Sequence, residues 1–101
     1  MGYQIYKTEL FAEIFNTLEK DEKVWIGKMV EQLKHNPYAG KPLKFPWFRE
    51  KKFRGARLYF IIYENLGKIL LVGFGGKKEQ QMIIDSILRN LDAYKRLAER
   101  L

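Results

Sequence analysis

Two short basic segments of the chain contain residue types that could act on an anion. The segment from Lys41 to Arg57 holds seven lysines and arginines and a single acidic residue, Glu50. The pair Lys77 and Lys78 follows an apolar stretch and two glycines. Cations held in fixed positions stabilise the negative charge that builds up on a reacting phosphate. The pattern therefore predicts a site for an anion, with Arg57 as its central residue.

The elements between these segments decide whether they meet. Residues 47–53, 57–64 and 68–74 are apolar or alternating, and they predict three consecutive antiparallel strands. Gly67 can adopt the positive φ that a turn between the last two strands needs. The third strand then ends beside the start of the second, which brings the two basic segments together. Crowded like charges repel, so such a cluster indicates a bound anion.

The expected strands also place single side chains. Arg57 is expected at the rim of the sheet with its guanidinium in solvent, on the same face as Tyr59, which is expected to pack in the core. The glycines before Lys77 are expected to let backbone amides approach the anion, at the positive end of a helix that begins at Lys77. Trp47 and Phe48 fit either the core or the lip of a binding site.

The rest of the chain completes an α+β order. Residues 3–7 predict a short strand, Thr8 can cap a helix that runs to about Lys20, and Asp21 can cap a second helix that forms a hairpin with the first. The end of the chain predicts one long amphipathic helix. The order β-α-α-β-β-β-α defines one domain of residues 1–101, a mostly antiparallel four-stranded sheet covered by an N-terminal helix hairpin and a C-terminal helix.

Composition narrows the class of function. The chain has no cysteine and a single histidine, His35, which excludes thiolate and histidine-rich metal sites. His35 is expected at a helix C-terminus and not in catalysis. No apolar run is long enough for a membrane span and the first residues do not form a signal peptide, so we expect a cytoplasmic protein.

Residues 41–101 carry a net charge of +8, against −1 for residues 1–40. This asymmetry fits an anionic partner (nucleic acid, acidic protein or membrane surface) or a solvated basic face.

Several short motifs, taken in order, resemble a known family. "GKPL", the strand "RLYFIIY" opened by Arg57, the segment "KILLVGFGGKKEQ" and a closing amphipathic helix resemble the RelE/ParE toxin superfamily, and within it the RelE/HigB-like branch. The resemblance covers residues 38–96. It implies a RelE-like fold and a toxin of a type II toxin–antitoxin system, a metal-independent mRNA endoribonuclease that inhibits translation on the ribosome. It also implies no cofactor, and as partners an acidic antitoxin, mRNA and the ribosome, with no membrane.

The resemblance assigns roles to individual basic residues. It implies that Arg57, Lys78 and Lys52 are catalytic and that there are no metal ligands. The clustering of basic residues in turn predicts that nucleic acid is bound by Lys51, Arg54, Lys77, Arg49 and Lys44.

The chain departs from the family pattern at two positions. Ile84 lies near the place where RelE-like RNases tend to carry a Tyr, and Val72 takes the place where HigB-like members often carry a His. An RNase would therefore have an atypical active site, with Glu50, Glu79 or a lysine as its base. Two alternatives stay open: a non-catalytic RelE-fold module that binds RNA, ribosome or protein, and a ParE-like gyrase inhibitor.

Overall fold

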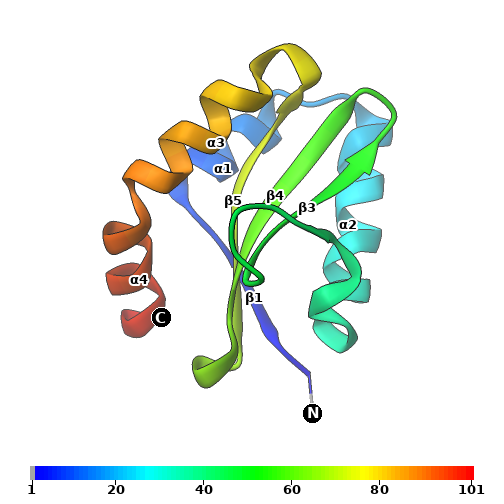
Figure 1. The fold of residues 1–101 in the computed structure, drawn as a ribbon. Coiled ribbons are helices and arrows are strands. Elements are labelled where there is room, and N and C mark those ends of the chain that lie inside the picture. Colours follow the sequence, from blue (N-terminus) through cyan, green and yellow to red (C-terminus); the bar gives the residue numbers. More distant parts are fainter. Residues whose placement is uncertain (1) are drawn as a thin grey trace.

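The computed structural model describes residues 2–101, which form one sheet with helices on both faces (Figure 1). The five strands lie in the order β1-β5-β4-β3-β2. Their bounds are β1 Gln4–Lys7, β2 Lys41–Pro42, β3 Phe48–Phe53, β4 Ala56–Tyr63 and β5 Lys68–Gly76. β1 runs parallel to β5, and the other neighbouring pairs are antiparallel. The expected α+β class and mostly antiparallel sheet are confirmed, with one strand more than predicted.

The additional strand is β2, which has only two residues. Lys41 lies opposite Glu50, and Pro42 lies opposite Arg49. A proline fits here because β2 is an edge strand, where a missing N–H donor is tolerated. Gly40 lets the chain approach β3 closely, since a Cβ at this position would lie 2.7 Å from the carbonyl oxygen of Glu50. So short a strand leaves no periodic pattern in the sequence.

Two helices cover one face of the sheet, α1 (Glu9–Asn16) and α2 (Lys20–His35). Thr8 caps α1 as predicted, because its Oγ1 accepts a hydrogen bond from the backbone N–H of Phe11 at 3.0 Å. Apolar side chains of both helices pack on the sheet. The buried residues of this core are Phe11, Ile26, Leu33, Leu58, Phe60, Ile62, Ile69, Leu71 and Phe74.

The start of α2 differs from the prediction. Its cap is Glu19 and not Asp21, which lies in the first turn. Glu19 and Glu22 form a reciprocal capping box, in which each carboxylate accepts from the other residue's backbone N–H. This arrangement satisfies two donors of the helix end at once. His35 is the last residue of α2, in agreement with the predicted place at a helix C-terminus.

The opposite face is covered by two helices and not by one long helix. A 3₁₀ turn at Lys77–Glu79 leads into α3 (Gln80–Arg89), and α4 (Leu91–Arg100) follows. Asn90 breaks the helix with φ −111° and ψ 14°, and its side chain donates to the carbonyl of Ser86 at 2.7 Å. The prediction of a single helix is wrong here because the polar Asn90 satisfies the preceding turn itself. The buried residues of this core are Phe48, Tyr59, Ile61, Leu70, Val72 and Ile87.

The two cores confirm that both faces of the sheet are covered, as the apolar runs of β4 and β5 predict. Gly67 joins these strands with the predicted positive φ, +63°. Within residues 2–101, no helix has both the length and the apolar character needed to cross a membrane.

Candidate anion-binding site

Arg57 lies on the central strand, opposite Lys52 of β3 and Gly75 of β5. Its side chain was expected in solvent, but the residue is only 7% exposed. The expectation is wrong because β4 has a strand on each side and because Gln80, at the start of α3, reaches over this face to Glu50. Arg57 is therefore a buried cation.

The counter-ion of Arg57 is Glu50 of β3, which is 2% exposed. The Arg57 Nε and the Glu50 Oε1 are 3.9 Å apart. The Gln80 side-chain amide donates to the same Oε1 at 3.2 Å, and the Arg57 Nη1 donates to the carbonyl of Gly55 at 3.3 Å. A buried charge is costly unless it is paired, so the two residues depend on each other. Glu50, one of the candidate bases in the sequence, therefore lies buried beside Arg57.

Tyr59 borders this ion pair and belongs to the core, as predicted. It lies directly opposite Glu50 in the ladder and is 0% exposed. Its buried hydroxyl and the Arg57 Nε have no hydrogen-bond partner within residues 2–101. Burial raises the pKa of Tyr59 to about 12, the negative charge of Glu50 adds to the rise and Arg57 opposes it. The Arg57 Nε is ion-paired with Glu50 but not hydrogen-bonded, and the neighbouring Tyr59 hydroxyl has no hydrogen bond either. Such buried atoms can accept a further polar partner.

Four exposed lysines lie on the face of the buried pair or follow the end of the neighbouring strand β5. Lys52 lies opposite Arg57 and Lys41 lies opposite Glu50, so both belong to the same face of the sheet. Lys77 and Lys78 follow the end of β5, as predicted. In the part of the chain that the structure describes, no carboxylate lies within 4.0 Å of these four ammonium groups. Their charge is therefore free for an anion. Lys41 belongs to the basic segment identified from the sequence but was not among the predicted site residues, because its position opposite Glu50 depends on the short strand β2.

Two of the predicted nucleic-acid-binding arginines have partners within the protein. Arg54 pairs with Asp21, in the first turn of α2, and its guanidinium lies 4.7 Å from the ring centroid of Phe53. Arg49 donates to the carbonyl oxygens of Pro46, Tyr38 and Gly40. Arg49 thus holds the loop before β3 in place.

The two remaining predicted lysines lie outside the group around Arg57. Lys51 is opposite Leu58, on the sheet face that α1 and α2 cover. Lys44 lies in the loop between β2 and β3, toward the other end of the sheet. Contact of either lysine with nucleic acid stays a prediction.

Two glycines near the end of β5, Gly73 and Gly75, have a packing role, and the predicted approach of backbone amides to an anion stays a prediction. A Cβ at Gly75 would lie 2.5 Å from the Cδ1 of Ile83, and one at Gly73 would lie 3.1 Å from its Cγ2. The backbone N–H of Lys77 donates to the carbonyl of Gly55 at 3.1 Å. The glycines therefore let α3 sit close to β5, and the Lys77 amide is already bonded.

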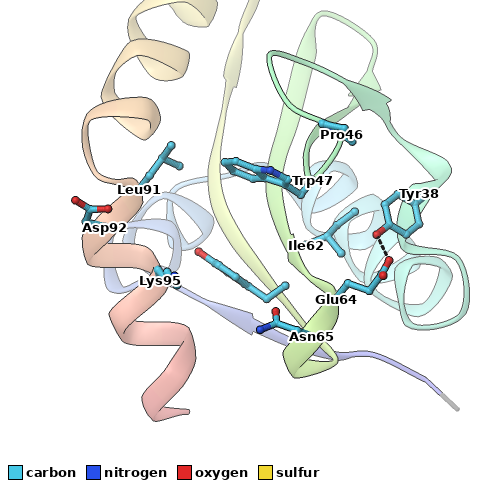
Figure 2. Close-up of a pocket in the computed structure, with 10 residues that line it drawn as sticks. Tyr38, Pro46, Trp47, Ile62, Glu64, Asn65, Leu91, Asp92 and Lys95 are labelled. Atoms are coloured by element: carbon cyan, nitrogen blue, oxygen red, sulfur yellow. Dashed lines mark hydrogen bonds between the residues drawn. The ribbon is translucent and has the colours of Figure 1, made fainter.

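A separate pocket of about 630 Å³ lies at the other end of the sheet, between α4 and the loop before β3 (Figure 2). Trp47 forms part of its wall and stacks on Phe45 with ring centroids 4.5 Å apart, whereas Phe48 is in the core. Tyr38 donates to the Glu64 carboxylate at 2.5 Å. Two carboxylates, those of Glu64 and Asp92, line this pocket against one ammonium group, that of Lys95, so the balance of charge does not favour an anion. Residues 2–101 contain no group of three or more His, Cys, Asp or Glu side chains suited to a metal ion.

The chain, with its five-stranded sheet, a helix pair on one face and a broken C-terminal helix on the other, has a fold similar to that of solved RelE toxin structures. A mutant of the Escherichia coli toxin RelE in the free state superimposes with a TM-score of 0.77 at 17% identity, over 89% of this chain and 98% of that one. The same mutant in complex with a peptide of the antitoxin RelB superimposes with a TM-score of 0.70 at 17% identity, over 85% of this chain and 95% of that one.

A RelBE toxin–antitoxin complex from Mycobacterium tuberculosis gives a TM-score of 0.66 at 15% identity, over 76% of this chain and 93% of that one. No protein-family model matches the chain, and no curated protein sequence matches it at a significant level. At these identities the likeness establishes the fold.

Proposed function

We propose that the protein is the toxin of a type II toxin–antitoxin system and that it inhibits translation by cleaving mRNA, without a metal ion, on the ribosome in the cytoplasm. The observation that carries the proposal is the buried Glu50–Arg57 pair, 3.9 Å apart, on a RelE-type fold. Lys41 and Lys52 lie on the same face, Lys77 and Lys78 follow β5, and none of the four has a carboxylate within 4.0 Å in residues 2–101. A carboxylate beside clustered cations combines a proton acceptor with stabilisation of phosphate charge.

In the proposed reaction, the 2′-hydroxyl of the substrate attacks the adjacent phosphorus. The bond between O2′ and phosphorus forms, and the bond to the 5′-oxygen breaks. Glu50 accepts the 2′ proton, and Lys52 or Lys78 donates a proton to the departing oxygen. Arg57 and the lysines stabilise the charge of the intermediate. For RNA to reach Glu50, the Gln80 amide has to release its 3.2 Å hydrogen bond.

One observation favours the second candidate function, a non-catalytic module that binds RNA or the ribosome. Glu50 and Arg57 are 2% and 7% exposed, so a substrate has little direct access to them. In that case the ion pair would stabilise the sheet, and the exposed lysines alone would bind phosphates. The two candidates differ in whether RNA is cut.

The proposed partner is an acidic antitoxin protein. The net charge of +8 after residue 40 would be neutralised by such a chain. A RelE structure of similar fold is bound to an antitoxin peptide.

The test is primer extension on a message under translation, with the wild type, Glu50→Gln, Lys52→Ala and Lys78→Ala. Glu50→Gln keeps the size of the side chain and removes the proton acceptor. We expect each variant to lower cleavage about 100- to 1000-fold, the usual loss for a group that stabilises a transition state. Lys28→Ala changes an exposed lysine on α2 and should cleave like the wild type. Intact RNA with the wild type, with and without ribosomes, would establish the non-catalytic function.

A further inference from the structure

The proposed reaction does not use the pocket between α4 and the loop before β3 (Figure 2). Its volume of about 630 Å³ lies in the range of small-molecule sites. Trp47 forms a fixed wall of this pocket, because Phe45 stacks on it with an angle of 5° between the rings. The Trp47 carbonyl also accepts a hydrogen bond from the Ile62 N–H at 2.8 Å. Tyr63 and Leu91 continue the wall, so the pocket has a preformed aromatic and apolar lining.

Two carboxylates lie on opposite sides of the pocket (Figure 2). Glu64 follows β4, and its Oε1 accepts a hydrogen bond from the Tyr38 hydroxyl, which holds this side chain in position. Asp92 lies in the first turn of α4. In the described residues 2–101, no lysine or arginine nitrogen lies within 4.0 Å of either carboxylate. Both carboxylates can therefore pair with a cation from outside the chain.

The cations of the protein near this pocket do not cancel its negative charge. Lys95 lines the pocket, and Arg49, whose guanidinium lies 4.9 Å from the ring centroid of Tyr38, already donates to three backbone carbonyls. Burial raises the pKa of Tyr63 to about 12, and the negative charge of Glu99 adds to the rise. Glu99 is thus a third carboxylate near the pocket, and three negative groups stand against two positive ones.

The lining fits an organic cation with a charge at each end. The face of an aromatic ring attracts a cation, and an apolar wall takes up methylene groups. A linear aliphatic diamine combines both features, because its ends are ammonium groups at neutral pH and its middle is apolar. A single cation would leave one of the two carboxylates unpaired, and an anion would be repelled by the excess negative charge.

We propose that this pocket binds a linear aliphatic diamine, either free or as part of a longer polyamine. The methylene chain lies on the Trp47 ring, and the terminal ammonium groups pair with Glu64 and Asp92. The ligand links α4 to the turn after β4, so it stabilises the folded protein. The site is separate from the Glu50–Arg57 pair, and binding of a diamine does not require RNA cleavage.

The experiment is an NMR titration of the RNA-free wild-type protein with putrescine, and with butylamine as the matched monoamine. We expect putrescine to shift the indole N–H signal of Trp47 in a saturable way and to leave that of Trp25, on α2, unchanged. Butylamine should bind about fivefold more weakly, the loss expected for one exposed ion pair. Putrescine should also raise the melting temperature of the protein.

Two variants remove one carboxylate charge each without changing the size of the side chain. Glu64→Gln and Asp92→Asn should each weaken putrescine binding about fivefold. The matched control is Glu13→Gln, which removes the same charge from an exposed residue of α1, on the other face of the sheet. It should bind putrescine like the wild type.

Three results would each overturn the proposal. The first is the absence of a saturable shift of the Trp47 signal. The second is equal weakening by Glu13→Gln, which would mean that putrescine senses only the overall charge of the protein. The third is equal affinity for butylamine, because the pocket would then take a single alkylammonium group, such as a lysine side chain of another protein. None of these results depends on whether the protein cleaves RNA.

Discussion

The Arg57 Nε lies 3.9 Å from the Glu50 Oε1, and both side chains are more than nine-tenths buried. A buried ion pair contributes little net stability when intact, but removal of one partner leaves an uncompensated charge. The geometry therefore links any catalytic role of these residues to their role in the fold.

We predict that Arg57→Ala lowers the free energy of unfolding by about 3–5 kcal/mol, because Glu50 is left buried without a counter-ion. The double variant Arg57→Met with Glu50→Leu should recover most of this loss, since it removes both charges. Urea unfolding followed by circular dichroism measures the effect. If Arg57→Ala unfolds at the same urea concentration as the wild type, the guanidinium must be solvated.

Two glycines should respond in opposite ways to the same substitution. A Cβ at Gly40 would lie 2.7 Å from the Glu50 carbonyl oxygen and 3.0 Å from the Cζ of Phe60, so Gly40→Ala should destabilise the protein by about 1–3 kcal/mol. Gly27 lies within α2 with nothing within 4 Å of such a Cβ. Gly27→Ala should therefore stabilise by about 0.5–1 kcal/mol. Thermal unfolding of both variants checks the prediction, and a stabilising Gly40→Ala would contradict it.

Local patterns in the sequence were sufficient for most elements of the fold. The Thr8 cap, the turn at Gly67 and the two-sided apolar runs depend on neighbouring residues, and the structure confirms each of them. The break at Asn90 was missed, because asparagine is tolerated within a helix and its bond to the preceding turn is visible only in three dimensions. The two residues of β2 are too few to show a period.

The positions of the candidate site residues in the fold could be predicted from the sequence, but the burial of Arg57 could not. Strand alternation and the direction of β5 bring Lys52, Lys77 and Lys78 to the same end of the sheet as Arg57. The exposure of the Arg57 guanidinium depends on long-range contacts. The main one is the hydrogen bond from Gln80 to Glu50, two residues that lie 30 positions apart in the sequence. No local pattern encodes such a contact.

Binding of single-stranded RNA should depend steeply on salt. Lys41, Lys52, Lys77 and Lys78 have no carboxylate partner in the described residues, and each phosphate contact changes the slope of log affinity against log salt by about −0.7. Four contacts predict a slope of about −3. Lys52→Ala should remove one phosphate contact and so make the slope shallower by about 0.7. Fluorescence anisotropy at several salt concentrations measures it, and a flat response would mean that the lysines only solvate this face.

The last prediction concerns the buried Tyr59 hydroxyl and alkaline pH. Burial and the nearby Glu50 raise the pKa of Tyr59 to about 12 in the folded protein, while an unfolded tyrosine titrates near 10. Between these two values the unfolded chain loses the proton and the folded protein keeps it, so stability falls as the pH rises. Below pH 10 both states are protonated, and the hydroxyl makes no pH-dependent contribution.

Tyr59→Phe should separate this effect from the titration of other groups. At pH 7 we expect its stability to equal or exceed that of the wild type by up to about 1 kcal/mol, because the lost hydroxyl has no hydrogen-bond partner. Between pH 10 and 12 both proteins should lose stability, but the wild type should lose more. The difference between the two losses should be roughly 2–3 kcal/mol, the equivalent of about two pKa units. Urea unfolding at pH 7, 9, 10, 11 and 12 gives both curves. Parallel loss of stability in the two proteins would show that Tyr59 titrates alike in the folded and unfolded states, and that its hydroxyl reaches solvent.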